Sequence, residues 1–134
     1  MAKWANASLL DGGSDLIRTL AGTAARVKQH LIKAYTAGDS YTVAVTVNGL
    51  GSVDMVAGDF VQSGAAGATR TTTIGAKSIT LTASSGAAPN LHIALVDSVS
   101  LAVLLVTDET SDQVVTSGGS FSVPAWTYTV AQPT

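Results

Sequence analysis

LHIALVDSVSLAVLLVTDE (residues 91–109) holds two almost uncharged apolar runs, separated by the short polar segment Ser98–Ser100. A third run, SFSVPAWTYTV, follows at residues 120–130 after a polar break. Apolar runs of this length with turn residues between them are typical of consecutive β-strands. Pro124 has no backbone N–H to donate, so we expect a bulge or an edge position there. The end of the chain therefore predicts packed β-structure.

The same pattern continues upstream. Strand signals recur about every 8–12 residues with turn signals between them, which is typical of an all-β sandwich or barrel. Asn48-Gly49 is a dipeptide that favours a tight hairpin. We therefore expect a mainly β protein, an antiparallel β-sandwich or jelly-roll-like barrel. Its upstream strands are predicted over 26–35, 41–47, 53–56, 60–62, 69–73 and 77–83.

One helix is predicted near the N-terminus, over residues 4–20. Leu residues and an Ile recur there on one side at helical spacing, although Gly12-Gly13 could start or break the helix. We expect one domain over residues 1–134, with an N-terminal helical arm (1–22) and a β-sandwich (23–134). The apolar stripe either packs on its own domain or docks on a neighbouring subunit. The predicted partner interface consists of Trp4, Leu9, Leu10, Leu16 and Ile17.

The composition favours a protein that works through its surface. Of 134 residues, 46% are hydrophobic and only 12% are charged, against roughly 25% charged in ordinary soluble domains. A surface of Ser, Thr, Gly and Ala can pack against another protein with little desolvation cost. A secreted or thermally robust β-domain is the alternative. The net charge of −2 gives no basic footprint for nucleic acid. The one local basic cluster is Arg26, Lys28, His30 and Lys33; its first three members alternate with apolar or neutral residues and are interpreted as a solvated strand face, with a contact to a charged neighbour as the alternative.

Targeting and redox features are sparse. The chain has no cysteine, so disulfides and thiolate metal sites are excluded. The first residues lack a continuous apolar region, so we expect no signal peptide and synthesis in a cytoplasm. The apolar run Leu101–Val106 is too short to span a bilayer, so no membrane partner is expected.

We expect no enzyme and no catalytic, cofactor-binding or metal-ligating residue. His92 is flanked by apolar residues and is interpreted as structural, and two histidines without cysteine or a local acidic partner do not make a zinc site. No nucleophile elbow is present, and GATRTTTIGAKS (residues 67–78) fails as a phosphate loop because Ala76 precedes the lysine. The turn acids, interpreted as solvated with weak calcium binding as the alternative, are Asp97, Asp108, Glu109 and Asp112.

Two stretches resemble a family of small structural proteins of tailed bacteriophages. KWANASLLDGGSDLIR (residues 3–18) is similar to the family's W-A-N…L-D-x-G-x-D-x-I-R opening. NLHIALVDSVSLAVLLVT (residues 90–107) and SGGSFSVPAWTYTVAQP (residues 117–133) resemble its closing A-L-V-D strand, hairpin and P-A-W strand. Ser14 departs from the pattern, since related openings carry a larger apolar residue there.

The resemblance implies a virion component, most plausibly a capsid decoration (cement) protein. Such a protein binds the outer lattice of the major capsid protein, stabilises the head and self-associates, here expected as a trimer. A head–tail junction, tail or fibre-base component is the first alternative. A cell-surface glycan- or protein-binding β-module is the second, although the scattered aromatic residues count against it.

Overall fold

The structure, a computed structural model, describes residues 4–5, 15–64 and 69–130. It is mainly β, with 43% strand and 15% helix, and its sheets are antiparallel. One short α-helix, α2 (Leu16–Ala21), lies near the N-terminus. The sequence prediction of a mainly antiparallel β protein with an N-terminal helix is therefore confirmed at this level.

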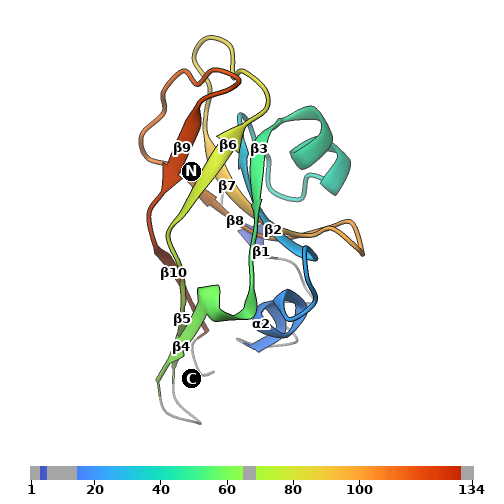
Figure 1. Cartoon of the computed structure of the whole chain (residues 1–134), viewed down its shortest axis with the longest axis vertical. Coiled ribbons are helices and arrows are strands. Elements are labelled where there is room, and N and C mark those ends of the chain that lie inside the picture. Colours follow the sequence, from blue (N-terminus) through green and yellow to red (C-terminus); the bar gives the residue numbers. More distant parts are fainter. Residues whose placement is uncertain (1–3, 6–14, 65–68, 131–134) are drawn as a thin grey trace.

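The larger sheet has seven strands in the order β1-β8-β7-β2-β3-β6-β9 (Figure 1). Its central strand pairs join segments far apart in the chain, since β2 lies between β3 and β7. The strands are β1 (Trp4–Ala5), β2 (Val27–Ile32), β3 (Gly49–Asp54), β6 (Lys77–Leu81), β7 (His92–Asp97), β8 (Ala102–Asp108) and β9 (Ser120–Val123).

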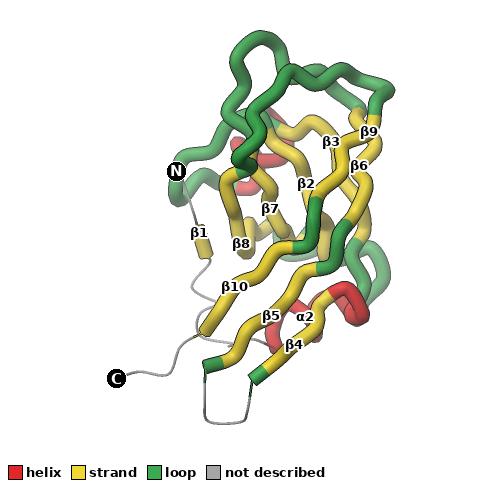
Figure 2. Tube along the Cα trace, turned by 90° about the vertical axis from the view of Figure 1, so that its left-hand side faces the viewer, coloured by secondary structure: helices red, strands yellow, loops and turns green. Residues whose placement is uncertain are grey.

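The smaller sheet has the order β10-β5-β4 and is formed by β4 (Phe60–Ser63), β5 (Arg70–Ile74) and β10 (Trp126–Val130). Chain segments pass directly from one sheet to the other, linking β3 to β4, β5 to β6 and β9 to β10. The adjacent strands β3, β6 and β9 of the large sheet are therefore connected to β4, β5 and β10, which are adjacent in the small sheet. The small sheet extends this half of the large sheet past a bend (Figure 2). Pro124 lies in this bend, between β9 and β10, where no ladder donor is needed.

The inner faces of both sheets meet in the core. Phe60 and Trp126 flank Ile74 across the small sheet, and this row packs in one apolar cluster with Leu95 and Leu105 of the large sheet. Burying side chains of this size stabilises the fold by about 1.5–3 kcal/mol each. A second cluster on the same side of the large sheet contains Leu31, Leu50, Ile79, Leu81, Leu91, Ile93, Val115, Phe121 and Val123.

The opposite face of the large sheet is partly covered by η2 (Thr42–Val47), a π-helix. The sequence prediction of a strand over Tyr41–Val47 is wrong. Ala44 of η2 packs on Ile32, Val96 and other residues of the sheet, and this tertiary contact overrides the β-propensity of the Val and Thr residues. Asn48 caps η2 rather than turning a hairpin.

The expected helix over residues 4–20 is also corrected. Trp4 and Ala5 form β1 and pair with Val106 and Leu105 at the edge of β8, because an exposed strand edge offers unpaired backbone groups that another segment can satisfy. The helix begins only at Leu16. A short 3-10 helix, η3 (Ala57–Asp59), precedes β4.

We predict that Gly51→Ala destabilises the fold by about 1–3 kcal/mol through overpacking. A Cβ at Gly51 would overlap the carbonyl oxygen of Thr80 and lie 3.0 Å from Cγ2 of Ile79. Urea unfolding followed by circular dichroism measures the change. Gly58→Ala is the matched control, since a Cβ there meets nothing within 4 Å; equal losses in the two variants would contradict the close approach of β3 and β6.

Candidate interaction surface

His92 lies in the interior with one ring nitrogen in hydrogen-bond contact and the other near a carboxylate. Its side chain is fully buried. Nδ1 lies 2.9 Å from the carbonyl oxygen of Asn90, and Nε2 lies 3.5 Å from Oδ1 of Asp108. The ring of Tyr35 packs beside it with centroids 6.0 Å apart. The sequence reading of a structural histidine fits this geometry, but Asp108 is an acidic partner that the sequence analysis did not identify.

His30 corrects the prediction of a solvated basic face on β2. Only 8% of His30 is exposed. Burial, helped by the positive charge of Lys28, lowers the pKa of His30 to about 4. The imidazole is therefore neutral at pH 7. Of the other basic residues in the cluster, Arg26 pairs with Asp97 and Lys28 pairs with Asp54.

The acidic residues after β8 bind backbone groups of the chain. Asp112 accepts a hydrogen bond from the N–H of Leu91 at 2.7 Å, and Glu109 accepts one from the N–H of Ser111 at 3.2 Å. Within the described ranges, no group of three or more His, Asp or Glu side chains is placed to hold a metal ion. These acids therefore act as turn and loop anchors.

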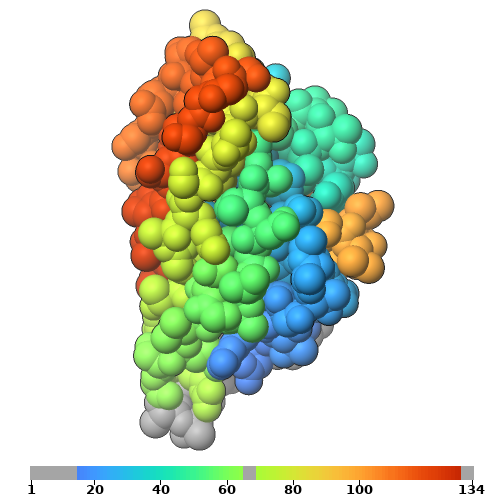
Figure 3. Space-filling view, in the orientation of Figure 1, coloured from blue at the N-terminus to red at the C-terminus, as the bar shows by residue number. Residues whose placement is uncertain are grey.

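The solvent-facing side of the bent sheet is covered with hydroxyl groups. This surface, which we name the hydroxyl face, runs across both sheets on the side away from the core, and Figures 1 and 3 view the β3-β6-β9 part of it. In register, Thr80 lies between Ser52 and Ser120, and Thr71 bonds Thr129 with 3.0 Å between their Oγ1 atoms. Its hydroxyl positions are Ser52, Ser63, Thr71, Thr73, Ser78, Thr80, Ser120, Ser122, Thr127 and Thr129. The exposed Val61 and Asp54, the latter paired with Lys28, lie on the same side of the sheet.

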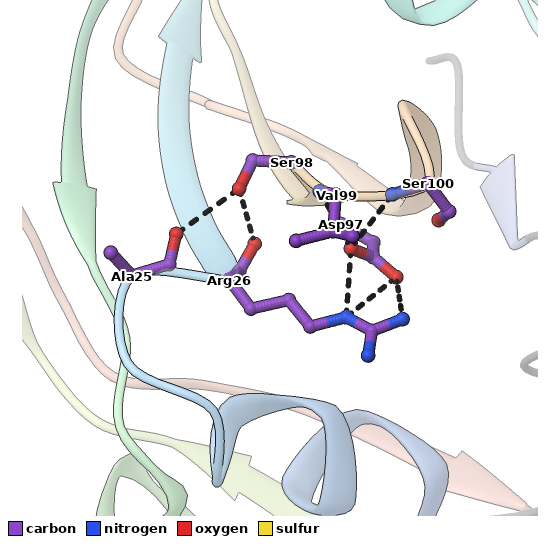
Figure 4. Close-up of polar contacts among 6 residues, drawn as sticks. All are labelled: Ala25, Arg26, Asp97, Ser98, Val99 and Ser100. Carbon is purple, nitrogen blue, oxygen red and sulfur yellow. Dashed lines mark hydrogen bonds and ion pairs between the residues drawn. The ribbon is translucent and has the colours of Figure 1, made fainter.

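The turn between β7 and β8 is fastened to the start of β2 by an ion pair (Figure 4). We name Asp97–Leu101 the β7–β8 tip. Arg26 donates from Nη2 to Oδ2 of Asp97 at 2.8 Å and from Nε to Oδ1 at 3.0 Å. Oδ1 of Asp97 also accepts the backbone N–H groups of Val99 and Ser100 at 3.0 and 3.2 Å. The carboxylate therefore ties the turn to itself and to β2.

Ser98 adds a second attachment to the same segment. Its Oγ–H lies within donating distance of the carbonyl oxygens of Arg26 and Ala25, at 2.9 and 3.1 Å. Its backbone N–H donates to the carbonyl oxygen of Arg26 at 2.8 Å. Ala25, which Ser98 contacts, and Leu101, at the end of the tip, have φ of 57° and 55°, a left-handed conformation that costs a non-glycine residue roughly 1–2 kcal/mol. The tip is therefore one defined conformation under strain, which is common at functional sites.

The β7–β8 tip presents apolar side chains to solvent. Val99 is 68% exposed and Leu101 is 62% exposed, while Asp97 at the base of the tip is only 2% exposed. The sequence interpretation of Asp97 as a solvated turn acid is therefore wrong. Hydrogen bonds from Arg26 and from the turn hold the pKa of Asp97 well below its usual range.

A cavity of about 340 Å³ lies between α2 and the base of the tip. We name it the tip cavity. Its charged groups, Arg26 and Asp97, are bonded to each other, Ser100 adds a further polar side chain, and the other lining residues are apolar. The lining residues are Leu16, Leu20, Arg26, Asp97, Ser100, Ala102 and Leu104.

The structure separates the residues predicted for a partner interface. Leu16 is half-buried and lines the tip cavity, whereas Ile17 is fully buried in the protein's own core. The backbone of Trp4 pairs with β8. Leu9 and Leu10 lie outside the described residues. The apolar stripe is predicted either to pack on its own domain or to dock on a neighbouring subunit. Ile17 packs on its own domain.

Sequence reasoning did not select Val99 and Leu101 as surface contacts. The available signal was the D-S-V-S-L turn, which places apolar residues in a tight connection between two buried strands. No protein-family model, curated protein or solved structure matches the chain. No helix among the described residues is both long and apolar enough to cross a membrane.

We predict that Asp97→Asn destabilises the protein by about 1–3 kcal/mol at pH 7, since hydrogen bonds to a charged partner are lost. The folded-state pKa of Asp97 is depressed, so its contribution is complete above the unfolded value of about 3.9 and declines as the pH falls below it. Urea titrations at pH 7 and pH 3 measure the free energy of unfolding of the wild type and of Asp97→Asn. The difference between the two proteins should be smaller at pH 3 than at pH 7.

Asp54→Asn is the matched control for this prediction. The carboxylate of Asp54 also pairs with a base of β2, Lys28, but the Asp54 side chain is 54% exposed. An exposed pair contributes below about 1 kcal/mol. The prediction is contradicted when the difference in unfolding free energy between the wild type and Asp97→Asn is the same at pH 7 and pH 3. That result would show that the charge of Asp97 does not stabilise the tip.

Proposed function

We propose that this chain is a structural protein of a tailed-phage virion, a decoration protein that binds the outer surface of the major capsid protein lattice and stabilises the head. The observation that carries the proposal is the hydroxyl face, an extended rigid surface of uncharged residues on adjacent strands. The resemblance of the WAN and PAW segments to phage structural proteins supports the same assignment. The expected location is the capsid surface, after synthesis in the host cytoplasm.

The physical basis of the proposal is a low cost of docking. Ser and Thr side chains are short, so little rotamer entropy is lost when they are covered. Their hydroxyl groups can donate and accept, so they pair with backbone or side-chain groups of a partner. None of these Ser and Thr positions carries a charge that would have to be removed from water when a partner covers the surface. Such a surface suits binding in many identical copies on a repeated lattice.

The finer fold assignment belongs to the same proposal. The two sheets share apolar clusters between their inner faces, and Trp126 packs against both clusters. We infer that the sheets form the two layers of an antiparallel sandwich or jelly-roll-like barrel.

The test is co-sedimentation of the purified protein with empty expanded capsids of the phage that encodes it. The wild type should bind and raise the melting temperature of the capsids, because a ligand that binds only the assembled state stabilises it. The double variant Thr80→Lys/Ser122→Lys should bind at least tenfold more weakly, since two charges must then be desolvated on the hydroxyl face. Both side chains are exposed, so the fold should be unaffected.

Ser111→Lys is the control, because it adds a lysine at an exposed loop position away from the hydroxyl face. Absence of wild-type binding and of any shift in capsid melting would overturn the proposal. Quantitative gel densitometry of virions distinguishes the alternative of a head–tail junction, tail or fibre-base component, since a decoration protein is far more abundant per particle than a junction ring.

A glycan-binding module has less support from the aromatic residues. Tyr35 is 7% exposed. The indole N–H of Trp126 donates to Oε1 of Gln29 at 3.1 Å in the interior between the sheets. The Tyr35 ring therefore lacks the open face that stacking on a sugar requires.

A further inference from the structure

We propose that the β7–β8 tip of one copy inserts Val99 and Leu101 into the tip cavity of a second copy, so that two copies associate reciprocally about a two-fold axis. This inference names a self-association surface, and it gives a dimer in place of the trimer expected from the resemblance to phage structural proteins. It does not depend on the protein's binding to a capsid. It rests on three properties of the described residues, namely the rigidity of the tip, the chemistry of the cavity and the position of the two on one hairpin.

The tip is organised before any partner binds. The Asp97 carboxylate and the Ser98 hydroxyl fix the turn through bonds to Arg26, Ala25 and the turn's own backbone. Ordering a flexible loop at an interface costs affinity, and a rigid loop avoids that cost. Val99 and Leu101 are exposed on this rigid support, so their burial by a partner yields apolar area with little loss of backbone freedom.

The cavity fits an apolar occupant of the size of a few aliphatic side chains. Its volume of about 340 Å³ lies at the lower end of the roughly 300–1,000 Å³ typical of binding pockets. The Nε and Nη2 groups of Arg26 are paired with the carboxylate of Asp97, so the charges in the wall neutralise each other. Leu16, Leu20 and Leu104 supply an apolar lining.

Adjacency of the tip and the cavity allows a reciprocal contact. Ser100 and Ala102 line the cavity, and Leu101 lies between them in the chain. The apolar projection and its receptor are thus on the same hairpin. When the tip of one copy enters the cavity of a second, the tip of the second is brought to the cavity of the first, which is the self-complementary geometry of a two-fold interface.

Sedimentation-velocity analysis over a concentration series, up to about 1 mM, tests the proposal. The wild type should form a dimer. Leu101→Asp should raise the dimer dissociation constant at least tenfold, and Val99→Asp is a second variant with the same expectation. Leu101→Asp should fold, because Asp tolerates the left-handed conformation better than Leu; an unchanged circular dichroism spectrum and melting temperature check this.

Val61→Asp is the matched control, since Val61 is 60% exposed on β4 and lies outside the tip and the cavity. This variant should dimerise like the wild type. A wild type that is monomeric throughout the series, or a loss of dimer in Val61→Asp equal to that in Leu101→Asp, would overturn the proposal.

A rescue experiment tests reciprocity directly. Leu20→Lys places a cation in the cavity, so this variant alone should also be monomeric. An equimolar mixture of Leu20→Lys and Leu101→Asp should form a heterodimer. In it the Asp tip meets the Lys cavity, and the unchanged Leu101 tip meets the unchanged cavity. The two-fold contact would be contradicted by a mixture that remains monomeric. It would also be contradicted by a wild type that forms a trimer instead of a dimer.

Discussion

The passage of three chain segments through both sheets is the constraint on which the rest of the structure depends. Because β3, β6 and β9 continue into β4, β5 and β10, the short sheet cannot move independently of the long one. The bend brings the row of Phe60, Ile74 and Trp126 against the cluster that contains Leu95 and Leu105. Core packing and strand continuity thus specify the same arrangement, which is the consistency expected of a uniquely folding sequence.

This constraint also determines which chemistry reaches the surface. Side chains alternate along each strand, so the positions opposite the core residues all face outward on the same side of the bend. On β5, β6, β9 and β10 the chain places Ser and Thr at these positions, and several of its charges form local pairs, such as Arg26 with Asp97 and Lys77 with Asp59. The hydroxyl face is therefore poor in charge, and the β7–β8 tip is a separate exposed apolar feature in the other half of the large sheet.

Local sequence patterns predicted the strands well because the local signals and the tertiary structure agree there. The apolar run at residues 91–97 is β7, and Pro124 marks the boundary between β9 and β10. The pattern failed at Thr42–Val47, where β-branched residues form η2 because Ala44 packs on the sheet. It also failed at Trp4–Ala5, whose strand conformation depends on a distant partner, β8.

The candidate surface was less predictable, since it depends on contacts between residues distant in the chain. Asp97 looks like an ordinary turn acid until β7 is placed beside β2 and its carboxylate meets Arg26. The acidic partner of His92 becomes evident only when β7 pairs with β8. Leu16 and Ile17 share a helix, yet one lines a cavity and the other is in the core; helical spacing alone does not distinguish them.

The measurement that tests the central claim most directly is a cryo-electron-microscopy map of the virion of the phage that encodes this chain. A decoration protein that docks through its hydroxyl face predicts density for this fold in many symmetry-related copies on the outside of the capsid lattice. In that density the β3-β6-β9 side of the bent sheet should face the major capsid protein. Density for this fold confined to the tail or the head–tail junction, or none in the particle, would contradict the account.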